Sequence, residues 1–93
     1  MKKITKELIK NFRRYLIEEE KAAATVEKYI RDINVFADWL GEKELDKETV
    51  LIYKENLTKN YAPASVNSVL SSLNSFFTFN EWYNLTDNIQ FQG

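Results

Sequence analysis

The sequence contains no cysteine and no histidine. Without cysteine the chain forms no disulfide and performs no thiolate chemistry, which fits a reducing compartment. Without histidine, imidazole acid–base catalysis and His-ligated metal sites are both excluded. The only two glycines, Gly41 and Gly93, stand alone, so there is no glycine-rich phosphate loop. We therefore expect a chain that is not an enzyme by itself, that binds no metal and that uses no cofactor.

The groups that remain offer little chemistry of their own. The acidic run 18–20 lacks the spaced ligands of a cation site and is typical of a solvated helix end. Five tyrosines are present, but none has a base or a group of cations nearby in the sequence that would activate it as a nucleophile. Binding is therefore a better expectation than catalysis.

Long apolar runs are also missing. No stretch approaches the ~20 apolar residues that a membrane helix needs, and no apolar signal segment follows the basic start at 1–3. Two glycines and one proline, beside many Glu, Lys, Leu and Ala, favour helices over strands. At 93 residues, the chain is expected to form one small, soluble, cytoplasmic domain without membrane contact.

Hydrophobic periodicity predicts four helices. Their expected bounds are about 6–20, 23–40, 47–59 and 63–83. Thr5 and Asp46 suit the N-cap positions of the first and third helices, and Gly41 suits the position just after the second. Pro63 fits the first turn of the fourth helix, where its missing N–H is no loss. Four helices with short connections predict a compact all-α bundle, with the second and fourth helices crossing.

Each helix carries an apolar stripe for a shared core. The stripe residues are Leu8, Phe12, Tyr15, Leu16, Val26, Tyr29, Ile30, Ile33, Phe36, Ala37, Leu40, Val50, Tyr53, Leu57, Val66, Val69, Leu70, Leu73, Phe76 and Phe77. Leu73 lies in the middle of the fourth stripe and is expected to be among the most buried residues. Trp39 is expected at the edge of the second stripe.

Charge is distributed unevenly along a chain whose net charge is −1. The first fourteen residues hold six basic residues and one acid, whereas the remainder holds seven basic and thirteen acidic residues. The basic residues of the first helix are Lys6, Lys10, Arg13 and Arg14. A basic end can follow a phosphate backbone while the whole chain stays near neutral. An ordinary solvated helix face is the alternative explanation.

The polar face of the fourth helix is unusual in composition. It carries Ser65, Asn67, Ser68, Ser72, Asn74 and Ser75. Serine and asparagine are indifferent helix formers, so helix propensity does not explain them on a solvated face. Their short, neutral side chains would let another surface approach closely. A merely tolerated polar face is the alternative.

Two stretches together resemble a known module. Residues 25–40 read Thr-x-x-x-Tyr-x-x-Asp-x-x-x-Phe-x-x-x-Leu, and residues 65–77 read Ser-Val-Asn-x-x-Leu-x-x-Leu-x-x-Phe-Phe. This combination resembles the N-terminal core-binding, SAM-like domain of tyrosine recombinases and phage integrases. The resemblance extends over about residues 5–84.

The resemblance implies a DNA-binding role. In that family the four-helix domain forms half of a clamp around duplex DNA, and a separate C-terminal domain carries the catalytic residues. The second and fourth helices lie across the DNA with their polar faces toward the major groove. The implied DNA contacts here are Thr25, Lys28, Arg31, Ser65, Asn67, Ser68 and Ser72, with secondary phosphate contacts from Lys6, Lys10, Arg13 and Arg14.

The same resemblance implies the partners. They are duplex DNA carrying recombination half-sites, and sister protomers of a full-length recombinase of bacterial or phage origin that works at the nucleoid. The isolated domain is expected to be monomeric. A helical protein–protein interaction module without DNA binding is the main alternative. A helix-turn-helix regulator is less favoured, because no short glycine-bearing turn joins two suitable helices.

Some positions depart from the family pattern. Ala22 occupies the place of a frequent serine N-cap, and the fourth helix has no Arg or Lys. Glu27 and Asp32 add negative charge near the implied DNA face. Serines lack the bidentate donor fork that discriminates bases, so weak contact led by shape is expected.

The chain is expected to divide into a helical domain, 1–84, and a C-terminal tail, 85–93. The tail is partly similar to a protease-recognition sequence of the kind added for recombinant expression, and a native tail is the alternative.

Overall fold

The structure, a computed structural model, describes residues 2–86. This part contains four α-helices and one short 3₁₀-helix, and no strand. They are α1 (Lys6–Glu18), α2 (Ala23–Leu40), α3 (Lys47–Asn60), α4 (Pro63–Phe79) and η1 (Tyr83–Leu85). The predicted all-α fold is confirmed. The predicted tail lies outside the described residues from position 87 onward.

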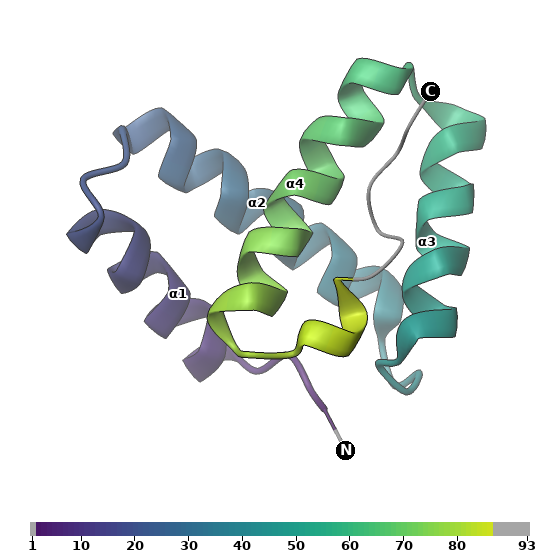
Figure 1. Cartoon of the computed structure of the whole chain (residues 1–93), viewed down its shortest axis with the longest axis horizontal. Helices are drawn as coiled ribbons and strands as arrows, with labels where there is room; N and C mark the ends of the chain where they lie inside the picture. The colour runs from purple at the N-terminus through teal and green to yellow at the C-terminus, as the bar shows by residue number, and fades with distance from the viewer. Residues whose placement is uncertain (1, 87–93) are drawn as a thin grey trace.

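The centre of the domain is the crossing of α2 and α4, which make more contacts with each other than any other pair of elements. α1 packs against α2, α3 packs against α4, and η1 contacts both α3 and α4. Figure 1 shows α1 and α3 on opposite sides of the crossing pair. The predicted crossing of the second and fourth helices is therefore confirmed.

The predicted N-caps form as expected. Thr5 Oγ1 accepts a hydrogen bond of 3.1 Å from the backbone N–H of Leu8, and Asp46 Oδ1 accepts one of 2.8 Å from that of Thr49. The Thr49 N–H and hydroxyl both donate to Asp46 and hold the pKa of its carboxyl below the ordinary value. Each cap satisfies an N–H that would otherwise lack a partner in the first helical turn.

α1 and α4 are each followed by a glutamate with positive φ, and both helices end earlier than the sequence predicts. Glu20 and Glu81 each adopt a φ of 60° just after α1 and α4. After α4, the N–H of Glu81 bonds to Thr78 O (3.0 Å) and the N–H of Trp82 bonds to Phe77 O (2.8 Å). This is the Schellman arrangement, with glutamate where glycine is usual. The prediction that the fourth helix reaches about residue 83 is wrong, because this motif stops it at Phe79.

The core contains most of the predicted stripe residues. Leu73 is 0% exposed, as predicted. Phe12 and Phe76 meet edge to face with ring centroids 5.3 Å apart, and Phe36 and Tyr53 do the same at 4.8 Å. The prediction that Tyr15 belongs to the core is wrong, because its side chain is 40% exposed. Half-buried, rather than buried, are Leu8, Tyr29, Ala37 and Val69.

Two buried apolar residues lie outside the predicted stripes. Leu45, in the connection before α3, is 3% exposed, and Leu85, in η1, is 0% exposed. Leu85 therefore belongs to the packed domain, which corrects its assignment to the tail. Trp82 leads the chain into η1, and its ring packs against Phe76 and Phe77 with centroids 5.9 and 6.2 Å away. Across the described residues, every helix is too short or too polar to span a membrane.

Candidate nucleic-acid interface

Three of the predicted contact residues meet at the α2–α4 crossing, together with Asp32. The Lys28 ammonium forms an ion pair with the Asp32 carboxylate one turn further along α2. It also donates to Ser68 O at 3.0 Å and to Ser72 Oγ at 3.2 Å, both on α4. Ser72 Oγ in turn donates to Asp32 Oδ2 at 2.7 Å. We call these four residues the crossing cluster.

The crossing cluster is largely closed to solvent. Ser72 is 0% exposed, and the side chains of Asp32 and Lys28 are 12% and 29% exposed. The prediction that Ser72 lies on an outer polar face is therefore wrong, because its hydroxyl faces α2. Its small size lets the two helices approach, and its hydroxyl satisfies a nearly buried carboxylate. Ser72 therefore stabilises the contact between α2 and α4, and it exposes no atom that a bound macromolecule could reach.

A second pair of predicted residues shares a groove beside the cluster. Arg31 of α2 and Ser65 of α4 are both exposed and line a groove of 280 Å³ between α2, α3 and α4. The other lining residues are Asp32, Val35, Tyr53, Leu57, Tyr61 and Val69. Burial raises the pKa of the Tyr53 hydroxyl, and the charge of Asp32 raises it further. The groove is thus apolar on its walls, with a cation at its edge.

Two of the predicted residues join neither group. Thr25 is half-buried near the start of α2, and Asn67 is exposed on α4. Neither lines the groove or bonds to the crossing cluster. The structure therefore brings together five of the seven predicted contact residues, in two neighbouring groups, and leaves these two apart.

The basic residues of α1 are not equivalent. Both terminal nitrogens of the Arg13 guanidinium donate to the Glu27 carboxylate on α2, with Nη2 3.1 Å from Oε1. This hydrogen-bonded pairing raises the pKa of Arg13 and lowers the pKa of Glu27. Lys6, Lys10 and Arg14 are exposed, and none has an ion-pair partner within residues 2–86. Among the described residues, α1 thus carries three exposed cations that form no ion pair.

Comparison with known proteins identifies the family of this domain. Residues 9–84 match the family described as phage integrase, N-terminal SAM-like domain. The chain belongs to this family. It is also 32% identical over 69 residues to tyrosine recombinase XerC of Treponema denticola, covering 68% of this chain and 23% of that recombinase. This SAM-like domain thus spans less than a quarter of that relative, and no solved structure is significantly similar to it.

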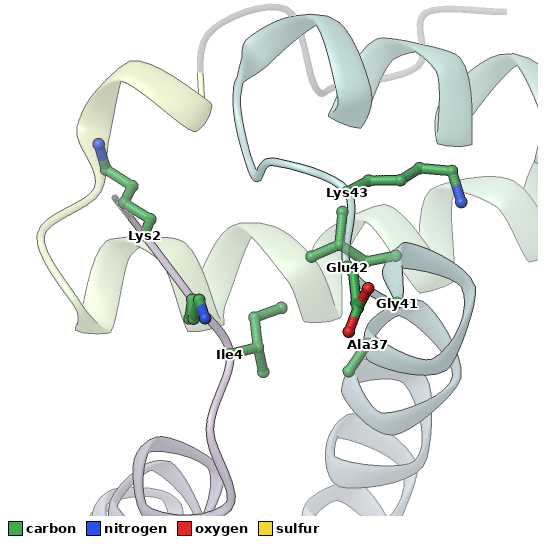
Figure 2. A pocket seen from close by; sticks show the side chains of 8 residues that line it. Lys2, Ile4, Ala37, Gly41, Glu42 and Lys43 are labelled. Atoms are coloured by element: carbon green, nitrogen blue, oxygen red, sulfur yellow. The ribbon is translucent and has the colours of Figure 1, made fainter.

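Other hollows of the SAM-like domain lie away from the crossing cluster. The larger one measures 510 Å³ and is lined by Tyr15, Leu16, Lys21, Tyr29, Asn74, Ser75, Thr78, Phe79, Glu81 and Tyr83. Figure 2 shows a smaller one, of 240 Å³, between the segment that precedes α1 and the end of α2. There the Lys43 amine turns back to the Trp39 carbonyl, 3.1 Å away, and lies over the Trp39 ring. Among the described residues, no group of His, Cys, Asp and Glu side chains could hold a metal ion.

Sequence reasoning overlooked two carboxylates as partners of the predicted cations. The spacing of Lys28 and Asp32, four residues apart on one helix, is a local signal that could have revealed their pairing. Arg13 and Glu27 lie 14 residues apart on different helices. No local pattern predicts that pairing, because it depends on how α1 packs against α2.

Proposed function

We propose that this SAM-like domain binds duplex DNA as the non-catalytic core-binding part of a tyrosine recombinase. It would hold DNA as half of a clamp while a separate domain catalyses strand exchange. The observation that carries this proposal is the family match over residues 9–84, which covers all four helices except the first turn of α1. The similarity to a named tyrosine recombinase supports the same role.

The proposed contact surface combines α2 and α4 with the exposed cations of α1. The direct contacts would be Thr25, Arg31, Ser65, Asn67 and Ser68, and the phosphate contacts would include Lys6, Lys10 and Arg14. Neutral serine and asparagine side chains allow close approach to the duplex, and the cations supply attraction to its backbone. Arg13 and Lys28 lie on the same elements, but each is paired with a carboxylate.

This surface predicts weak, largely sequence-independent binding. The chain has a net charge of −1, and α4 contributes no cation. We expect dissociation constants in about the micromolar range or weaker, with strong dependence on salt. The proposed cellular setting is the cytoplasm, at the nucleoid, on recombination half-sites and beside sister protomers of the full-length enzyme. The isolated domain would be a monomer.

An NMR titration of the 93-residue chain with short duplex DNA tests this proposal. The expected result is a set of amide shifts concentrated at 25–32 and 65–72, moving with added DNA and reversing with added salt. Shifts confined to 2–14 would instead indicate electrostatic adhesion by α1 alone. Absence of shifts at millimolar DNA would reject DNA binding.

One observation favours a second function, a helical protein–protein interaction module. Several large apolar side chains are solvent-exposed, among them Ile17 (58%), Val35 (54%) and Tyr61 (59%). Scattered apolar side chains are common on protein surfaces, but Val35 and Tyr61 both line the groove between α2, α3 and α4 and so share one apolar surface. This function would be preferred if DNA left the amide spectrum unchanged while the chain self-associated in sedimentation experiments.

A further inference from the structure

We propose that Asp32 weakens DNA binding by holding the Lys28 ammonium inside the domain, so that removing this carboxylate strengthens binding. This inference rests on the proposed function, because it concerns how strongly the same α2–α4 surface meets phosphate groups. It makes Asp32 a negative determinant of affinity, and it removes Lys28 from the set of residues that contact DNA in the parent chain.

The hydrogen bonds of Lys28 are fully used within the domain. A lysine ammonium has three N–H donors. Its acceptors here are the Asp32 carboxylate, Ser68 O at 3.0 Å and Ser72 Oγ at 3.2 Å. Two of these acceptors belong to α4, so the ammonium bridges the two helices. A phosphate would therefore have to displace one of these three acceptors.

The burial of Asp32 makes that exchange unfavourable. Its side chain is 12% exposed, and besides Lys28 it accepts the Ser72 hydroxyl at 2.7 Å. If Lys28 left, a nearly buried carboxylate would keep a single neutral donor and no cation, which is a costly arrangement. The pair therefore stays closed, and to an approaching duplex it contributes no net charge. Of the two basic residues on α2 that were predicted to contact DNA, Arg31 alone is exposed.

Lys28 would become available if the carboxylate were neutralised. Its side chain is already 29% exposed, so part of it reaches the surface. A lysine ammonium on a flexible four-carbon stem can extend to water when no counter-ion retains it. In the D32N variant the amide can still accept the Ser72 hydroxyl, so the α2–α4 contact keeps that bond. The closed neutral pair becomes a mobile cation between Thr25 and Arg31.

The test compares the 93-residue parent chain with D32N, K28Q/D32N and D38N. Each is titrated by fluorescence anisotropy into a labelled 20-base-pair duplex at 50–200 mM NaCl. One additional phosphate contact steepens the salt dependence by about 0.9 and is worth about eightfold in affinity at 0.1 M salt. D32N is therefore expected to bind about five- to tenfold more tightly, with that steeper slope.

The other two variants separate the release of Lys28 from a simple change of charge. K28Q/D32N has the net charge of the parent and lacks the ion pair, so it is expected to bind within about twofold of the parent. D38N removes one negative charge from an exposed position on the same helix. It is also expected to stay within about twofold. A gain in D38N equal to that in D32N would mean that only net charge matters, and would overturn the inference.

The remaining outcomes separate the inference from the proposed function. If the parent binds DNA and D32N binds equally or more weakly, the inference is wrong and the proposed function stands. Binding by K28Q/D32N about eightfold weaker than the parent would show that Lys28 already contacts phosphate, and this comparison remains decisive if D32N alone does not fold. If no chain binds, both proposals fail.

NMR of the Lys28 side chain gives a readout without DNA. The ε-methylene signals of Lys28 should be distinct in the parent and should move to the position of a mobile lysine in D32N. Mobile signals in the parent would overturn the inference.

Discussion

Ser72 and Asp32 are joined across the α2–α4 crossing by a hydrogen bond of 2.7 Å between Oγ and Oδ2, at a point where the serine is 0% exposed. A carboxylate in such a place is stabilised only if its oxygens are satisfied. The serine is small enough for the helices to meet and polar enough to supply the donor. Ser72 is therefore expected to stabilise the folded domain and to fix the spacing of α2 and α4 in the proposed DNA-binding surface.

The S72A variant is expected to lower the free energy of unfolding by about 1–3 kcal/mol, because a hydrogen bond to a charged group is lost and Asp32 keeps only Lys28. Urea denaturation measures the change. S71A is the matched control, since Ser71 is exposed on the same helix. It should leave stability unchanged or raise it slightly through helix propensity. Equal effects of the two substitutions would contradict a role for the buried hydroxyl.

The L73A variant should cost about 2–5 kcal/mol, because Leu73 is 0% exposed and its truncation leaves a cavity in the core. Such a loss is a large share of the stability of a domain this small. Thermal and urea unfolding measure it. Leu51, 38% exposed on α3, provides the comparison, and L51A is expected to cost well under half as much. A melting temperature within a degree or two of the parent would contradict the placement of Leu73.

The E81G variant is expected to stabilise the domain by up to about 1 kcal/mol. Glu81 has a φ of 60°, which is strained for residues with a Cβ and free of strain for glycine. The same reasoning applies to Glu20 after α1. E19G is the control, because Glu19 has an ordinary φ of −81° and gains only flexibility in the unfolded state. Stabilisation by E19G, or none by E81G, would speak against strain at the end of α4.

Acid should weaken the α1–α2 contact through Glu27. The hydrogen bonds from Arg13 hold the pKa of this carboxyl below its ordinary value. A lowered pKa in the folded state stabilises folding above the unfolded pKa, and this contribution is lost as pH falls through the folded pKa. Between pH 6 and pH 3 the parent should therefore lose more stability than E27Q, as urea denaturation at each pH would show. Identical pH profiles would rule out the contribution, and 0.5 M salt should reduce the difference.

We expect Arg31 to be the residue of α2 that contacts DNA phosphate. R31A is expected to weaken binding to every duplex to a similar extent and to reduce the salt slope by about one. K47A, at an exposed position on α3, should leave both quantities unchanged. Anisotropy titrations at several salt concentrations distinguish the two. A loss confined to one DNA sequence would mean that Arg31 reads bases, and an unchanged slope would remove it from the interface.

Local chemistry made much of this fold predictable. Thr5 and Asp46 predict the starts of two helices, because a short oxygen-bearing side chain can accept a hydrogen bond from a first-turn N–H without help from the rest of the fold. The end of α2 followed from Gly41 in the same way. The predicted ends of α1 and α4, at about 20 and 83, lie beyond the observed ends at Glu18 and Phe79, because Glu20 and Glu81 occupy positions where glycine is the usual signal.

Long-range packing explains the remaining differences between the predicted and the observed core. The burial of Ser72 depends on a partner 40 residues away on α2, which no periodicity encodes. Leu45 and Leu85 are single apolar residues without a repeating pattern, so only the packed domain reveals that they are core. For the candidate site, the sequence and family resemblance predict DNA contacts on α2 and α4, and contact of these helices with DNA stays a prediction. The spacing of Lys28 and Asp32 could have revealed their ion pair, but the bonds from Lys28 to Ser68 and Ser72 depend on how α2 packs against α4.

The crossing of α2 and α4 has a consequence for how the chain acquires its structure. The Asp32–Ser72 contact closes a loop of 40 residues that contains all of α3. Closing such a loop costs about 3 kcal/mol in chain entropy, before any contact across it forms. Until α4 leaves the ribosome, the apolar faces of α2 and α3 lack the helix on which both depend. Folding during synthesis should therefore wait for α4 and then proceed in one cooperative step.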